Sequence, residues 1–109
     1  MSKDQPASSE KQSVEDATLT ANALKAMANP LRWRIICALG SEELSVGDIM
    51  KIIGASQSNT SQHLDLLRSK NIIKTRKDAN KVYYSISNDQ LLALISNMRS
   101  VLCPTNLED

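Results

Sequence analysis

The sequence has 109 residues, enough for one domain with a modest core and too few for two domains of ordinary size. Apolar residues make up 41% of the chain and charged residues 23%, and the net charge of +1 excludes a uniformly basic or acidic protein. No apolar run approaches the roughly 18 residues that cross a bilayer, and the start, MSKDQPASSEKQS, lacks the hydrophobic centre of a secretion signal. We therefore expect one folded domain in the cytoplasm, with no membrane partner.

Two helices are predicted in the first part of the chain. Residues 1–13 hold almost no large apolar side chain, so we expect them to form a flexible tail. From residue 14 to residue 28 apolar residues recur at three- and four-residue steps, which predicts the first helix. Asn29 and Pro30 then suit the cap and the first turn of a second helix, which Gly40 ends.

Two shorter helices separated by a tight turn are predicted next. Ser45 and Asp48 form a capping-box pattern at the start of a third helix, which Gly54 ends. Ser56 is placed to cap a fourth helix that continues to about Ser69. The pair is a candidate helix-turn-helix.

The hydrophobic period then changes from 3.6 residues to about 2. The stretches IIKTRK and KVYYSI flank a short turn-forming DAN, which predicts a two-stranded hairpin with cationic side chains near its tip. The following SND offers caps for a last helix, whose apolar stripe runs up to Cys103 and stops at Pro104. We expect residues 14–103 to form the domain and residues 104–109 to form a flexible C-terminal tail.

The fourth helix has an apolar face and a face of short polar side chains. Thr60, Leu64 and Leu67 lie on one side at 100° per residue, and hydroxyl and amide side chains on the other side match the hydrogen-bonding edges of bases in the major groove. The start of the helix suits a phosphate, and the basic hairpin suits further phosphate contacts or a minor-groove arm. The expected DNA-binding residues are Ser56, Gln57, Ser58, Asn59, Ser61, Gln62, His63, Arg68, Lys74, Arg76, Lys77 and Lys81.

Each of these signals also has a structural explanation. A polar helix start is often only a cap with a solvated face, and lysines often only protect an edge strand from aggregation. Their adjacency in this order favours double-stranded DNA. His63 has no second ligand at metal spacing, so we expect it to pack the helix or contact a phosphate. No catalytic set of residues is recognisable, so we do not expect an enzyme.

Four stretches taken together resemble the ArsR family of bacterial transcriptional repressors: LKAMANPLRWRIICAL, ELSVGDI, SQSNTSQHLDLLRSKNII and TRKDANKVYYSI. The resemblance covers residues from about 19 to 103. It implies a mostly α-helical winged helix-turn-helix with a small β-hairpin, in the order of four helices, two strands and a last helix. It also implies a homodimer, formed through the first and last helices, that binds an inverted-repeat operator. The apolar stripes on residues 17–28 and 91–102 fit such an interface.

The resemblance also bears on ligands. The cysteine motif CVCD of metal-sensing members reads SVGD here, at residues 45–48, and residues 88–109 contain no histidine, so we expect no metal and no other cofactor. Cys37 and Cys103 remain, and their placement resembles the branch that contains BigR, SqrR and HlyU. That likeness implies a redox-sensing pair. Reactive sulfur species or oxidants would join the pair by a disulfide or polysulfide bridge and lower the affinity for DNA.

Two alternatives stay open at this point. Cys37 lies in an apolar run and could be core filling only, which would leave an ArsR-like DNA-binding regulator with non-sensing cysteines. The chain could also be a protein interaction module on a winged-helix scaffold, with weak and sequence-indifferent DNA binding. If the thiols do react, a nearby arginine, Arg32, Arg34 or Arg99, could lower a thiol pKa, and which of them faces the sulfur stays open.

Overall fold

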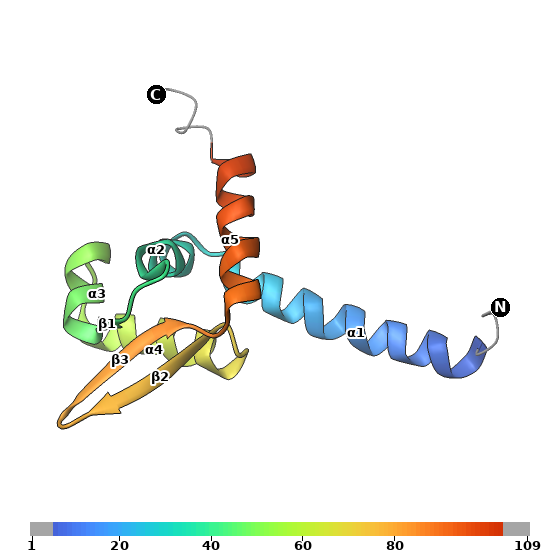
Figure 1. Cartoon of the computed structure of the whole chain (residues 1–109), viewed down its shortest axis with the longest axis horizontal. Helices are drawn as coiled ribbons and strands as arrows, with labels where there is room; N and C mark the ends of the chain where they lie inside the picture. Colours follow the sequence, from blue (N-terminus) through green and yellow to red (C-terminus); the bar gives the residue numbers. More distant parts are fainter. Residues whose placement is uncertain (1–5, 104–109) are drawn as a thin grey trace.

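The computed structural model describes residues 6–103, with side chains from residue 13 onward (Figure 1). Within this range the chain forms the helices α1 (Pro6–Met27), α2 (Pro30–Leu39), α3 (Val46–Ile53), α4 (Gln57–Ser69) and α5 (Asp89–Leu102), and the strands β1 (Leu44–Ser45), β2 (Ile73–Asp78) and β3 (Lys81–Ile86). The predicted order of four helices, a hairpin and a last helix is confirmed. No helix in the described range is long and apolar enough to cross a membrane.

The small sheet has the strand order β1-β3-β2, and both pairings are antiparallel. The hairpin of β2 and β3 runs from the pair Ile73 and Ile86 near the core to the pair Asp78 and Lys81 at its tip. The turn places Ala79 at a φ of 58°, in the left-handed region. β1, which the sequence pattern did not predict, adds two residues to the free edge of β3. The hairpin projects from the helices as a wing (Figure 1).

The core is aliphatic, as expected for a chain without phenylalanine. It lies between α2, α3, α4 and the base of the hairpin, where Ile35, Ile49 and Leu67 are fully buried. Thr60 is also buried, and its hydroxyl donates to the carbonyl oxygen of Ser56 at 2.7 Å. This hydrogen bond removes the cost of burying a hydroxyl group. The predicted inner face of α4 is therefore confirmed.

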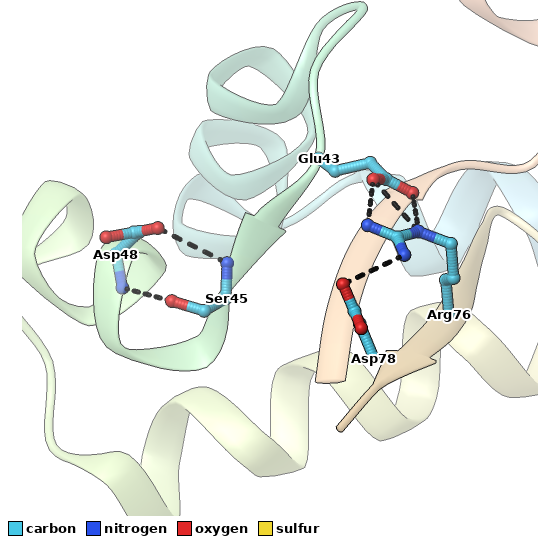
Figure 2. Close-up of polar contacts among 5 residues, drawn as sticks. All are labelled: Glu43, Ser45, Asp48, Arg76 and Asp78. Carbon is cyan, nitrogen blue, oxygen red and sulfur yellow. Dashed lines mark hydrogen bonds and ion pairs between the residues drawn. The ribbon is translucent and has the colours of Figure 1, made fainter. Parts of the chain in front are cut away.

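The predicted helix caps are also confirmed. The Asn29 side chain accepts the N–H of Arg32 in α2, and the Ser56 hydroxyl accepts the N–H of Asn59 in α4. At the start of α3, Ser45 Oγ accepts the Asp48 N–H and Asp48 Oδ2 accepts the Ser45 N–H, which completes the capping box (Figure 2). Local hydrogen bonding of these side chains sets where three of the helices begin.

The first helix is longer than predicted. α1 begins at Pro6 and not near residue 14, so residues 6–13, which were expected in a tail, are helical. The other residues expected in tails, 1–5 and 104–109, lie outside the described range. From residue 13 onward, α1 is buried only in its last turn, at Ala26 and Met27, and the helix extends away from the rest of the chain (Figure 1).

Candidate nucleic-acid interface

α4 is positioned by the turn that precedes it and by an arginine from α2. Gly54 ends α3 with a φ of 66°, which glycine adopts without strain. Arg34 donates hydrogen bonds to the carbonyl oxygens of Ile52 at 2.7 Å and Ile53 at 3.3 Å. Carbonyls at the end of a helix have no partner within it, so Arg34 satisfies these two and holds the turn against α2.

Most side chains predicted to contact base edges lie on the outer face of α4. Gln57, Ser58, Asn59 and Gln62 are exposed, and Ser61 is half-buried. The opposite face packs into the core, so the helix cannot rotate without exposing leucines. Short hydroxyl and amide groups held in this way match the donors and acceptors of the major groove.

Two of the predicted DNA-binding residues, Ser56 and Arg68, differ from the others in role or in position. The oxygen of the Ser56 hydroxyl accepts the Asn59 N–H at 3.1 Å, so this side chain serves as the cap of α4. Arg68 is exposed in the last turn of the same helix. At 1.5 Å per residue it lies about 16 Å along the axis from Gln57. The structure therefore does not bring Arg68 together with the polar side chains at the start of the helix.

His63 lies on the flank of α4 that faces α2. Its side chain is half-buried, and Nδ1 is 3.3 Å from Nη1 of Arg32. Burial lowers the pKa of His63, and the neighbouring positive charge of Arg32 lowers it further. The structure supports the predicted packing role, whereas the phosphate contact stays a prediction.

The register of the hairpin divides the cationic side chains of the wing between its two faces. Side chains alternate along a strand, and cross-strand partners point to the same side. Lys74, Arg76 and Lys81 therefore share one face, and Lys77 lies on the other face with Ile73. All four cationic residues are exposed. A wing built in this way presents positive charge on both sides of its tip.

Arg76 is held by acidic side chains (Figure 2). Its Nε lies 3.1 and 3.0 Å from the two carboxylate oxygens of Glu43, and Nη2 lies 2.8 Å from Glu43 Oε1. Nη1 is 3.7 Å from Asp78 Oδ2, and the guanidinium lies 5.1 Å from the centre of the Tyr83 ring. The hydrogen bonds lower the pKa of Glu43 and raise the pKa of Arg76. A phosphate contact by Arg76 therefore requires a carboxylate to be exchanged for a phosphate.

The two thiols lie on α2 and at the end of α5. Cys37 is half-buried in α2, and Cys103 follows α5, where its N–H donates to the carbonyl oxygen of Arg99 at 3.0 Å. Burial raises the pKa of Cys37; the charge of Arg99 opposes this rise, and a thiolate at Cys103 adds to it. Of the three arginines considered from the sequence, Arg99 is thus the one that lowers the Cys37 pKa.

An apolar cavity of about 610 Å³ opens beside Cys103. It lies between the last turn of α1, the start of α2 and the end of α5, and its wall includes Met27, Trp33, Met98 and Arg99. Cys103 is part of this wall, whereas Cys37 is not. Among residues 6–103, no group of three or more histidine, cysteine or acidic side chains is arranged to hold a metal ion.

Comparison with known proteins agrees with this arrangement. Residues 29–75 match the family described as bacterial regulatory protein, arsR family. The nodulation protein NolR of Rhizobium meliloti is 44% identical over 87 residues, which are 80% of this chain and 71% of that protein. The chain belongs to the arsR family.

Two solved structures are similar to this arsR-family chain and indicate its branch of the family. Reduced HlyU from Vibrio cholerae has a TM-score of 0.76 and 36% identity, covering 85% of this chain and 98% of that chain. The repressor BigR from Xylella fastidiosa has a TM-score of 0.72 and 29% identity, covering 86% and 96%. HlyU and BigR belong to the branch that the sequence resembles, so that relationship is confirmed. As an arsR-family protein, the chain is a DNA-binding transcriptional regulator and not an enzyme.

Three residues of the site were not predicted as part of it. Arg32, Arg34 and Glu43 hold other elements in place through contacts that span 6 to 33 positions of the sequence. For Arg32 and Arg34, the usable signal in the sequence was the presence of two charged residues, one on either side of Trp33, within an otherwise apolar helix. Glu43 gave none, because its partner Arg76 lies on a strand far along the chain.

Proposed function

We propose that this arsR-family regulator is a homodimeric repressor that binds an inverted-repeat operator and releases it when Cys37 and Cys103 become joined by sulfur. One observation carries the proposal. Cys103, at the end of α5, lines an apolar cavity open to small molecules, and its charge is one cause of the raised pKa of the Cys37 thiol on α2. A reactive and a resolving thiol in such an arrangement are suited to reversible oxidation.

The homodimer is supported by apolar side chains that the described chain leaves uncovered. Val14 and Leu19 on α1 are 65% and 69% exposed, and Val101 and Leu102 on α5 are 79% and 71% exposed. These helices project from the body at neighbouring positions (Figure 1). Exposed apolar residues in such number mark an interface, and a two-fold dimer would place two copies of α4 on successive major grooves, about 34 Å apart.

Cys103 is the thiol that a reagent meets first, because it lines the cavity. With a persulfide RSSH, the Cys103 thiolate attacks the outer sulfur, RSH leaves, and Cys103 becomes a persulfide. Cys37 then attacks Sγ of Cys103, forms the disulfide and releases H₂S. The two thiols are oxidised and the persulfide is reduced, with one RSH and one H₂S formed per bridge.

Other reagents lead to related bridges. If a second persulfide first transfers its outer sulfur to the Cys103 persulfide and leaves as RSH, Cys37 attacks the middle of the three sulfurs, forms a trisulfide bridge and releases H₂S. With a hydroperoxide ROOH, Cys103 becomes a sulfenic acid and ROH leaves, and Cys37 then condenses with it and releases water. In each case Cys37 is the resolving thiol. Burial raises the pKa of Cys37, which disfavours it as the first nucleophile.

The relatives support a role in regulation through this chemistry. BigR is described as a transcriptional repressor, and the HlyU structure is that of the reduced protein. We carry both descriptions to this chain as part of the proposal. The coupling to DNA follows from position, because a bridge between α2 and α5 joins the body that holds α4 to a helix of the proposed interface.

The thiol switch is tested by measuring DNA affinity and protein mass together. The operator is a duplex that the reduced protein selects from a random-sequence pool. A persulfide donor should weaken operator binding by the wild-type protein. The protein mass should then fall by two hydrogens, for a disulfide, or rise by the sulfur of a longer bridge. The variants Cys37→Ser and Cys103→Ser should stay bound to the operator. Cys37→Ser should retain an adduct at Cys103, whereas Cys103→Ser should stay unmodified. Release of DNA by both variants would show that the cysteines only pack.

The DNA contacts are tested with two further variants. Gln62→Ala should relax sequence preference, because it removes a base contact, whereas Lys77→Ala should weaken binding to all sequences and flatten the dependence on salt. Equal, weak binding of the selected and random duplexes by the wild-type protein would favour an interaction module.

A further inference from the structure

Arg32 makes three hydrogen-bonding contacts with three different segments. Its backbone N–H donates to Asn29 Oδ1 at 3.1 Å, and its Nε donates to the carbonyl oxygen of Ala26 at 2.6 Å. Its Nη1 lies 3.3 Å from Nδ1 of His63. A guanidinium has only donors, so His63 must accept through Nδ1 and carry its proton on Nε2. The side chain therefore links the end of α1 to the recognition helix α4.

The contact with Ala26 lies at the place where α1 is attached to the body. Ala26 and Met27 are 2% and 7% exposed, whereas Val14, Leu19 and Leu24 along the same helix are about half to two-thirds exposed. The carbonyl of Ala26 is one of the last four of the helix and has no partner within it. Arg32 supplies that partner, so the direction of the projecting helix depends on this guanidinium.

The contact with His63 lies beside the face of α4 that reads DNA. His63 stands between Gln62, which is exposed, and Leu64, which is buried. Burial and the charge of Arg32 both lower the pKa of the imidazole, which favours the neutral form that the Arg32 contact requires. The contact between Nδ1 and Arg32 gives α4 a second attachment besides its buried leucines, and this attachment leads to the end of α1.

We propose that Arg32, acting through His63, is a positioning residue that fixes the recognition helix relative to α1 and so sets the half-site spacing that the dimer reads. This inference rests on the proposed function, because α1 is a helix of the proposed dimer interface. In a two-fold dimer, any displacement of α4 relative to α1 is repeated in both subunits. Its component along the line that joins the two recognition helices therefore changes their separation by twice that amount.

Two variants of His63 separate this role from the alternatives. In His63→Asn, Oδ1 stands two bonds from Cβ, as Nδ1 does, so the acceptor is kept. In His63→Leu the volume is similar and the acceptor is lost. A direct phosphate contact would be lost in both variants, whereas a positioning role would be lost in His63→Leu alone.

The experiment compares the affinity for the selected operator with that for the same operator carrying one additional base pair between its half-sites. We expect His63→Asn to keep the wild-type ratio of the two affinities. We expect His63→Leu to reduce the ratio about tenfold, which is the lower end of what the loss of one hydrogen bond with a charged donor is worth. The slope of affinity against salt should stay the same, because no phosphate contact is removed.

Arg32→Met completes the test. Added to His63→Leu, it should reduce the ratio no further, because the two side chains act as one unit. If Arg32→Met fails to fold, the two His63 variants still decide the question. An unchanged ratio in His63→Leu, or an equal loss in both His63 variants, would overturn the inference. Failure of the wild-type protein to prefer the selected operator over random duplex would instead overturn the proposed function.

Discussion

Replacement of Ser56 separates stability from DNA binding at the start of the recognition helix. In Ser56→Ala the hydroxyl that accepts the Asn59 N–H at 3.1 Å is lost. In Ser56→Asp a carboxylate oxygen keeps that hydrogen bond and places a negative charge at the positive end of the helix. Ser58 is the matched control, because it is an exposed serine two positions further along and is not the cap.

The size of the effect follows from the cap. Loss of an N-cap side chain costs about 1 kcal/mol of the free energy of unfolding. With a urea dependence of about 1–2 kcal/mol per molar, the midpoint of Ser56→Ala should fall by about 0.5–1 M. Ser56→Asp and Ser58→Ala should stay within about 0.5 kcal/mol of the wild-type protein, as surface substitutions do. Ser56→Asp should nevertheless lose operator affinity, because its carboxylate repels phosphates.

The assay is urea unfolding followed by circular dichroism at one fixed protein concentration, since dimer formation would make stability depend on concentration. Operator affinity is measured in parallel on the folded proteins. A wild-type midpoint in Ser56→Ala, or equal midpoints for Ser56→Ala and Ser56→Asp, would refute the assignment of this hydroxyl to the cap. Wild-type affinity in Ser56→Asp would show that DNA does not approach this end of α4.

Three further outcomes are expected. Leu67→Ala should lower the free energy of unfolding by about 2–5 kcal/mol, because Leu67 is fully buried; Arg68→Ala, on the exposed side, should shift it by less than about 0.5 kcal/mol, as calorimetry or urea unfolding would show. Arg76→Ala should flatten the salt dependence of operator affinity less than Lys77→Ala does, since Arg76 is neutralised by carboxylates; equal slopes would contradict this. The pKa of His63 is lowered on folding, so the unfolded chain binds more protons below the ordinary pKa of about 6.5 and stability should fall as the pH decreases. This decrease should be absent from His63→Asn, and a rise in wild-type stability on acidification would contradict it.

The helix boundaries were predictable where a side chain near the boundary sets it. Asn29, Ser45 and Ser56 each bond to a backbone N–H three positions further along, so a short window of sequence contains the whole interaction. The inner face of α4 was predictable for a related reason. Its buried residues repeat at the helical period, and any helix that packs one face against a core shows this repeat in its sequence.

Other features had no local signal. The first turns of α1 lack apolar side chains, so their helical structure left no periodic pattern. β1 has two residues, fewer than an alternating pattern needs, and it forms through pairing with Tyr83 and Tyr84. Arg76 was predicted from composition as a phosphate contact, but its pairing with Glu43 depends on two segments that meet only in the folded chain.

Arg34 determines how motion at one end of the domain would be passed to the other. Its side chain extends from α2, and its guanidinium donates hydrogen bonds to the last two carbonyls of α3. The tight turn after α3 leads directly into α4. The end of α3 and the turn that leads into α4 are therefore attached to α2 through this side chain. A displacement of α2 at Cys37 would be passed through Arg34 to the turn that precedes α4.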